Sequence, residues 1–110
     1  MTYESLTRAT FKPPQFDQGD KHLYERENGW GFSCNMVSNC HTVFSGCHHN
    51  YEVRDRLVSA GVINETCEED TESSCMYVYF KTKDDGLAFL DRLNKYLVSK
   101  SEKLLAALAY

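Results

Sequence analysis

The stretch from residue 75 to residue 97, CMYVYFKTKDDGLAFLDRLNKYL, contains the two elements that decide the fold. In residues 75–80, methionine, valine and phenylalanine alternate with cysteine and tyrosine, so apolar or aromatic side chains point to both sides of a predicted strand. This pattern is typical of a central strand, or of a strand whose tyrosine face meets a partner. The polar residues 82–86 then end the strand and begin a helix.

The helix predicted after this strand runs from about residue 85 to residue 109. Leucines recur along one stripe, and acidic residues stand at its start, as the helix dipole favours. A helix of about 25 residues is about 37 Å long, whereas a typical strand is roughly 17–20 Å long. We therefore expect its end to extend beyond the sheet, or the helix to break at 99–101. An exposed leucine edge would bind a partner or form a homodimer, through Leu104, Leu105 and Leu108.

A β-hairpin is predicted near the start of the chain. Asn28-Gly29 is a favoured type I′ turn pair, because both central positions of that turn need positive φ. The segment 23–27 precedes the turn, and in the segment 30–36 apolar residues alternate with small or polar ones, which is typical of a strand with one buried face. A further short strand is predicted at 42–44.

A shorter helix is predicted at about 51–60. Asn50 is in position to cap its N-terminus, because a side-chain oxygen there can accept a bond from a free backbone N–H. Gly61 suits the left-handed position that follows a helix C-terminus, and Val62 can make the apolar contact of a Schellman motif.

Residues 1–20, which contain Pro13-Pro14, are expected to form an extended N-terminal arm whose phenylalanines pin it to the core. The remainder is expected to form a single α+β domain over 21–110, with a small antiparallel sheet in one layer and helices in the other. The parts of this domain are the N-terminal hairpin, a central strand near 75–80, a short helix at about 51–60 and a long C-terminal helix at about 85–109.

Length and charge narrow the classes of protein. The 110 residues suit one domain, and no apolar stretch or leader of the kind that enters a membrane occurs, so we expect a cytoplasmic protein with no membrane partner. A net charge of −4 argues against direct nucleic-acid binding driven by bulk charge. Five cysteines, an odd number without an export signal, are expected to stay reduced.

Cysteine and histidine are concentrated between residues 34 and 49. Thiolate sulfur and neutral imidazole are the preferred ligands of zinc, and four of them form a closed site. The cysteines are separated by five and six residues, however, and no CxxC pair occurs. A zinc-stabilised domain is therefore an alternative hypothesis, with zinc as its cofactor and Cys40, His41, Cys47 and His48 as its ligands.

A cysteine-nucleophile enzyme is a second alternative. Cys47 lies just before the helix predicted at 51–60, a position that lowers the pKa of a thiol, and His48 is an adjacent proton acceptor. Neighbours in sequence rarely have the geometry that this chemistry needs, and no oxyanion-hole motif accompanies them.

Acidic residues form the other dense cluster. Five carboxylates within eight residues could imitate phosphates and occupy a basic groove on another protein, gaining mainly steering and specificity. The simpler alternative is a solvated loop without a partner. The residues are Glu65, Glu68, Glu69, Asp70 and Glu72.

No catalytic or nucleotide-binding signature occurs in the sequence. We therefore expect a non-enzymatic protein-binding module, a small acidic inhibitor or adaptor that masks a basic surface of a larger partner. The nucleic-acid-binding surface of such a partner is one example of a basic surface that the protein would mask. The acidic cluster and the C-terminal leucine edge are its two predicted contact surfaces.

Overall fold

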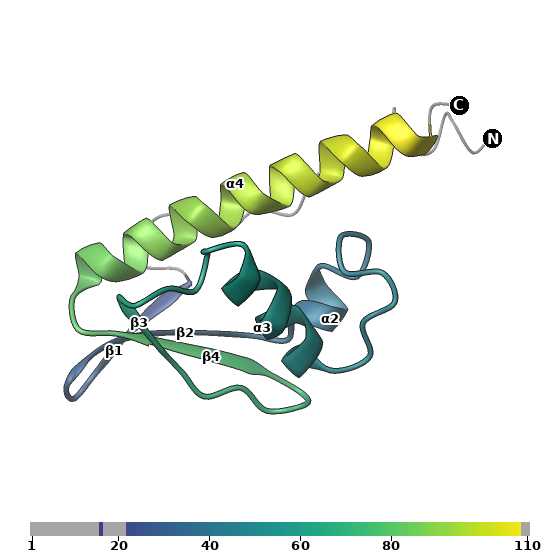
Figure 1. Cartoon of the computed structure of the whole chain (residues 1–110). Coiled ribbons are helices and arrows are strands. Elements are labelled where there is room, and N and C mark those ends of the chain that lie inside the picture. The colour runs from purple at the N-terminus through teal and green to yellow at the C-terminus, as the bar shows by residue number, and fades with distance from the viewer. Residues whose placement is uncertain (1–15, 17–21, 109–110) are drawn as a thin grey trace.

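The computed structural model describes Phe16 and residues 22–108, and it confirms an α+β fold with a four-stranded antiparallel sheet. In Figure 1 the long helix α4 lies across one face of this sheet. The strands lie in the order β1-β2-β4-β3, so β2 and β4 are central. The elements are β1 (Leu23–Arg26), β2 (Gly29–Cys34), α2 (Met36–Asn39), α3 (Asn50–Ser59), β3 (Cys67–Glu69), β4 (Met76–Phe80) and α4 (Lys83–Leu108).

The two faces of the sheet differ, as the alternation in β4 predicted. Met76, Val78 and Phe80 are buried in the core, whereas Tyr77 and Tyr79 are half-buried and point to the other side. Buried side chains of α3 and α4 lie in the same hydrophobic core as Met76, Val78 and Phe80, so both helices cover that face of the sheet. We call the opposite face, which carries the two tyrosines, the open face.

The predicted hairpin is confirmed, but its turn lies one residue earlier than expected. β1 and β2 pair from Leu23 opposite Phe32 to Arg26 opposite Gly29, which leaves Glu27 and Asn28 in the loop. Of the turn residues, only Gly29 has positive φ, 146°, so the turn is not the predicted type I′ pair.

The reason for glycine at position 29 is the neighbouring strand. A Cβ atom built on Gly29 would collide with the carbonyl oxygen of Phe80 in β4. The close approach of β4 therefore selects glycine there, in addition to the positive φ.

The strand predicted at 42–44 does not form. After α2, residues 40–46 form turns, and the N–H of Phe44 donates to the carbonyl of Cys40 at 3.0 Å. These turns place the ring of Phe44 parallel to that of Tyr96 on α4, with 6.1 Å between centroids. An aromatic residue here anchors the turns onto the long helix rather than extending the sheet.

α3 begins one residue earlier than predicted. It ends at Ser59, shortly before Gly61, as the sequence indicated. Gly61 has a φ of 77°, its N–H donates to the carbonyl of Val58, and the N–H of the buried Val62 donates to that of Leu57 at 2.9 Å. This pair of bonds is the predicted Schellman motif. Asn50 does not cap α3, because it is the first residue of the helix and its side chain bonds elsewhere.

α4 is continuous, so the break considered at 99–101 is absent, and it starts two residues before the predicted position. The hydroxyl of Thr82 accepts the N–H of Asp85 at 3.1 Å and so caps the helix. In Figure 1 the C-terminal end of α4 reaches beyond the sheet. Its fully buried stripe consists of Phe89, Leu90, Leu93, Leu97 and Ser101.

Phe16 is the one described residue of the arm predicted at 1–20, and Phe11 lies outside the described residues. The ring of Phe16 packs edge-on against Phe32 at a centroid distance of 5.4 Å. The Asn94 side chain of α4 bonds to both backbone groups of Phe16: Oδ1 accepts its N–H at 2.8 Å, and Nδ2 donates to its carbonyl at 2.7 Å. Phe16 therefore pins the chain to the core, as expected for this residue.

Candidate functional site

The cysteines and histidines of the zinc hypothesis do not form a ligand set. Among the described residues, which include all four of them, no three His, Cys, Asp or Glu side chains are grouped so that they could hold a metal ion. Cys40 and Cys47 are 2% and 6% exposed and belong to the hydrophobic core, whereas His41 and His48 are exposed. The two thiols are buried in the core and the two imidazoles are exposed to solvent, so the fold does not bring the four side chains together.

The thiol chemistry of the enzyme hypothesis also differs from expectation. Burial raises the pKa of the Cys47 thiol above its ordinary value, and the nearby Arg56 guanidinium offsets only part of that rise. Burial likewise raises the pKa of Cys34 to about 11 and that of Cys40 to about 12. These thiols stay protonated at neutral pH, whereas a nucleophilic cysteine needs the thiolate.

All five cysteines are free. Cys67 lies opposite Phe80, at the far end of β4 from Cys75. Five residues of strand separate the two positions by roughly 16 Å, more than twice the reach of a disulfide. The fold therefore keeps the two thiols that flank the acidic cluster apart.

The acidic cluster is not a simple loop, because two of its residues, Glu68 and Glu69, lie in the edge strand β3. Glu68 lies directly opposite Tyr79 on β4, and the N–H of Asp70 donates to the carbonyl of Tyr77 at 3.0 Å. Residues opposite each other in an antiparallel pair point to the same face. Glu68 and Asp70 therefore border the open face beside the two tyrosines.

Glu69 points to the other face and does not belong to this surface. Its Oε2 lies 3.7 Å from the guanidinium of Arg54 on α3, and its Oε1 is buried without a hydrogen-bond partner in the described part of the chain. The Arg54–Glu69 pair joins α3 to the edge strand. Glu69 therefore faces away from the open face, and its predicted role in partner binding stays a prediction.

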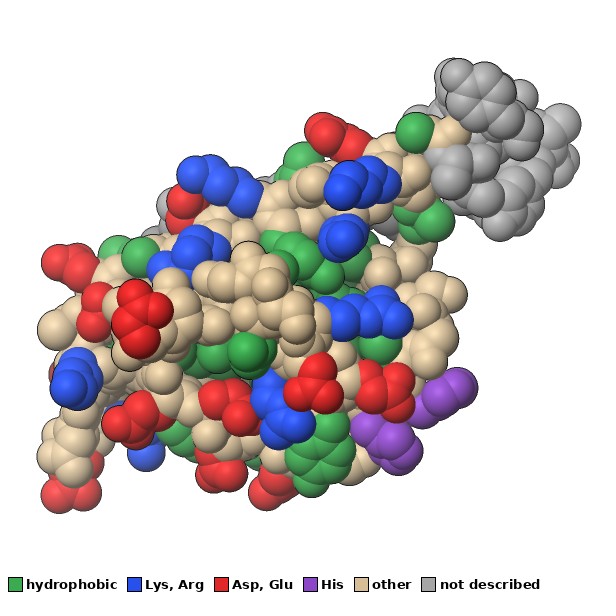
Figure 2. Space-filling view, viewed as in Figure 1, with side chains coloured by type: hydrophobic (Ala, Val, Ile, Leu, Met, Phe, Trp, Pro, Cys, Tyr) green, Lys and Arg blue, Asp and Glu red, His purple; other side chains and the backbone are tan. Residues whose placement is uncertain are grey.

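The four other carboxylates of the cluster are exposed, and none of them forms an ion pair with another described residue. Figure 2 shows most of the acidic side chains below α4, whereas many of the basic ones lie along that helix. No ion pair with a described residue therefore neutralises these carboxylates, although Arg26 and Lys81 line the same pocket as Glu65 and Glu68. The four are Glu65, Glu68, Asp70 and Glu72.

A row of residues crosses the open face from strand to strand. Tyr24 is opposite Gly31, which is opposite Tyr79, which is opposite Glu68. The ring of Tyr24 fills the space above Gly31, where a Cβ atom would collide with it. The guanidinium carbon of Arg26 lies 3.6 Å from the centre of the Tyr79 ring, which is a close cation–π contact.

Tyr77 lies in a different environment from Tyr79. No cation among the described residues lies over its ring. Asp70 lies across from it on one side, and Ser33 on the other. A hydrogen bond with the Cys75 thiol is the largest cause that raises the pKa of the Tyr77 phenol, and the charge of Glu72 adds to the rise. The tyrosines and the acids stand in separate segments of the sequence, and their placement on one face depends on the register of β3 and β4.

The leucine edge predicted at the end of α4 is only partly described. Leu104 is half-buried, and the side chains of Leu105 and Leu108 lie outside what the structure describes. A homodimer through this helix stays a prediction.

Comparisons with family models, curated proteins and solved structures found no match to this chain. None of the described helices is both long enough and apolar enough to span a membrane.

Proposed function

We propose that the protein is a non-enzymatic binding module whose open face binds a basic, lysine- and arginine-rich surface of a protein partner. The observation that carries this proposal is the position of Tyr77 beside the unpaired carboxylates of Asp70 and Glu72. The acidic cluster keeps its predicted role in binding a basic partner. The proposed contact surface is centred on Tyr77, which lies next to the cluster.

The chemistry of this surface suits cationic side chains. A tyrosine ring attracts a guanidinium or ammonium group over its face, and an adjacent carboxylate adds a charge-assisted hydrogen bond. The chain already uses the first of these contacts, because Arg26 lies over Tyr79. Tyr77 has no such cation of its own among the described residues, so a basic side chain of a partner would find an open ring there.

The edge strand also favours binding to a charged partner over self-association. β3 is the last strand of the sheet, and an exposed edge of this kind pairs with other strands unless charge opposes it. Glu68 and Asp70 would repel an equally acidic copy of the chain and attract a basic protein. A basic surface that binds nucleic acid is the class of target that this charge suits.

An arginine-rich peptide tests the proposal without knowledge of the partner. We expect a labelled nona-arginine peptide to bind at low salt in fluorescence anisotropy, and the double variant Asp70→Asn/Glu72→Gln to bind about fivefold more weakly, since each exposed ion pair contributes about 0.5 kcal/mol. Tyr77→Leu is expected to weaken binding about threefold through the lost cation–π contact.

The matched control is Asp84→Asn/Glu102→Gln, which removes the same two charges from exposed positions on α4. Its affinity for the peptide is expected to fall less than twofold. Equal weakening in both double variants would mean that the peptide responds to net charge alone, and the open face would lose its assigned role.

A further inference from the structure

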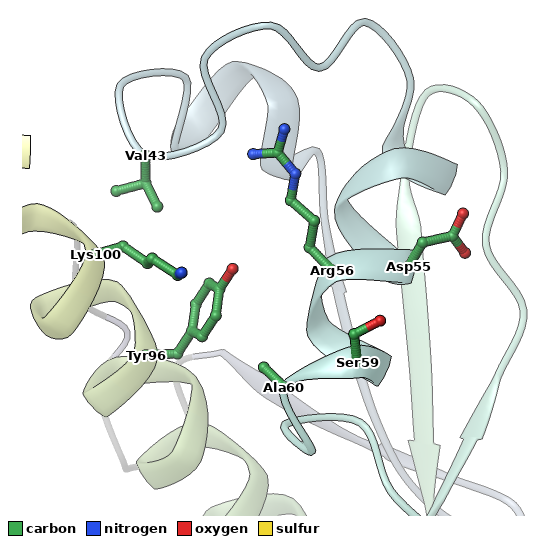
Figure 3. A pocket seen from close by; sticks show the side chains of 7 residues that line it. All are labelled: Val43, Asp55, Arg56, Ser59, Ala60, Tyr96 and Lys100. Atoms are coloured by element: carbon green, nitrogen blue, oxygen red, sulfur yellow. The ribbon is translucent and has the colours of Figure 1, made fainter. Parts of the chain in front are cut away.

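A groove on the side of the sheet that the helices cover is lined by basic side chains, whereas the chain as a whole is acidic. The groove lies between α3, α4 and the turns at 40–46, and its volume is about 530 Å³ (Figure 3). This volume is within the range of small-molecule sites. Its lining residues are Val43, Asp55, Arg56, Ser59, Ala60, Tyr96 and Lys100.

Two cations line this groove from different elements. Figure 3 shows the side chain of Arg56, on α3, and that of Lys100, on α4, extending into it from opposite walls. Neither forms an ion pair with another described residue. Asp55, at the rim, points away from the groove and bonds to Arg54 at 3.0 Å. The groove is therefore positive in a chain of net charge −4.

Tyr96 adds a hydrogen-bond donor between the two cations. Its hydroxyl points into the groove (Figure 3), and its ring is held against Phe44. Burial raises the pKa of the Tyr96 phenol, and Arg56 lowers it by less, so the hydroxyl keeps its proton at neutral pH. Ser59 lies on the α3 wall with its hydroxyl directed away from Tyr96 (Figure 3), and Val43 is apolar.

We propose that this groove binds the phosphate monoester of a small organic molecule. The phosphate would lie between Arg56 and Lys100 and accept the hydroxyl hydrogen of Tyr96, and the organic part would lie against Val43 and Ala60. The ammonium of Lys100 lies 5.5 Å from the centre of the Tyr96 ring, but neither cation has an acidic partner among the described residues. A phosphate monoester carries a charge of about −1.5 to −2 at pH 7, which these two cations balance, whereas a carboxylate carries only about −1. The planar guanidinium also matches two phosphate oxygens at once.

Size argues for an organic phosphate over the inorganic ion. The groove is far larger than a single phosphate group, and its apolar walls at Val43 and Ala60 would stay wet if only the ion were bound. This site lies on the helix side and does not depend on the function proposed for the open face.

The test is a titration followed by ¹H–¹⁵N NMR with three probes: phenyl phosphate, orthophosphate and benzoate. We expect phenyl phosphate to give saturable shifts confined to the groove residues. Orthophosphate and benzoate are each expected to bind at least about fivefold more weakly, because the first lacks the apolar body and the second lacks one negative charge. Shifts that do not saturate, or equal affinity for phenyl phosphate and benzoate, would overturn the proposal.

Variants locate the site. Arg56→Gln and Lys100→Gln are each expected to weaken phenyl phosphate binding about tenfold, and Lys103→Gln, an exposed lysine outside the groove, less than twofold. Tyr96→Phe keeps the ring against Phe44 and removes only the hydroxyl, so we expect about threefold weaker binding in a folded protein. Equal effects of Lys100→Gln and Lys103→Gln would show that phosphate responds to charge anywhere on α4.

Discussion

The segments 34–50 and 65–72 contain the two densest groups of chemically active side chains, and the fold places them in opposite environments. In the first segment, Cys40, Cys47 and Asn50 are 2%, 6% and 1% exposed. In the second segment, four of the five carboxylates are exposed. Residue type alone suggested a site in both segments, yet the first separates buried thiols from exposed imidazoles, whereas the second keeps four of its five carboxylates on the surface.

The neighbours of each group explain the difference. The cysteines of 34–50 are interleaved with large apolar residues such as Met36 and Phe44, whose burial stabilises the fold by about 2 kcal/mol each. Burying those residues draws the short thiols into the core with them. The segment 65–72 contains no large apolar residue, so nothing draws it inward beyond the edge strand.

Asn50→Ala is expected to have the largest effect on stability. The Oδ1 atom of Asn50 accepts the N–H of Met36 at 2.8 Å, and its Nδ2 donates to the carbonyl of Ser73 at 2.9 Å. The variant leaves the N–H of Met36 without its acceptor at the junction of α2 and α3, whereas the Ser73 carbonyl keeps the bond from the backbone N–H of residue 50. We expect the free energy of unfolding to fall by about 3 kcal/mol, measured by urea denaturation.

The matched control is Asn39→Ala, whose exposed side chain donates to the carbonyl of Asn35 at 2.8 Å. Its expected cost is below about 0.5 kcal/mol, because water replaces an exposed bond. Similar costs for the two variants would contradict the structural role assigned to the 34–50 segment.

The buried thiol of Cys40 predicts an intermediate effect, visible only in alkali. Its pKa is about 12 in the folded chain, against 9.0 ordinarily, so the folded state holds the proton that the unfolded state loses. This contribution to stability is complete below pH 9 and is lost as the pH rises from 9 to 12. The slope is at most about 1.4 kcal/mol per pH unit.

Cys40→Ala isolates this slope from the tyrosines and lysines that titrate in the same range. At pH 8 we expect the variant to be less stable by about 1–2 kcal/mol, because a small cavity forms. The gap between the variant and the parent protein is expected to narrow at pH 10 and pH 11 in urea denaturation. A constant gap would show that the Cys40 thiol does not titrate with folding.

The sequence could predict the features that depend on local pattern. Strand alternation at 75–80 determined which side chains of β4 are buried, and Gly61 identified the end of α3, because each depends on residues within one element. The position of Gly29 was misassigned because its close neighbour is the carbonyl of Phe80, which lies far along the chain. Asn50 was taken for a helix cap for the same reason, since its partners are 14 and 23 residues away.

The candidate sites divide in the same way. The acidic cluster could be found from composition, but its contact with Tyr77 requires the register of β3 against β4. The groove could not be predicted from the sequence, because Arg56 and Lys100 lie on different helices and no short sequence motif contains both. Both candidate sites are formed by contacts between elements that are far apart in the sequence. A single sequence contains no local signal for such contacts.

The smallest expected effect separates two adjacent glutamates that composition treats as equivalent. Glu68 is exposed beside Tyr79, so Glu68→Gln should change the free energy of unfolding by less than about 0.5 kcal/mol, with a slight gain because it relieves repulsion along the edge. Glu69 is half-buried against Arg54, so Glu69→Gln should cost about 1 kcal/mol. Urea denaturation of both variants at low and high salt measures the difference. If Glu68→Gln proved the more costly, the charges of β3 would serve the fold rather than a partner, and the open face would have to bind without them.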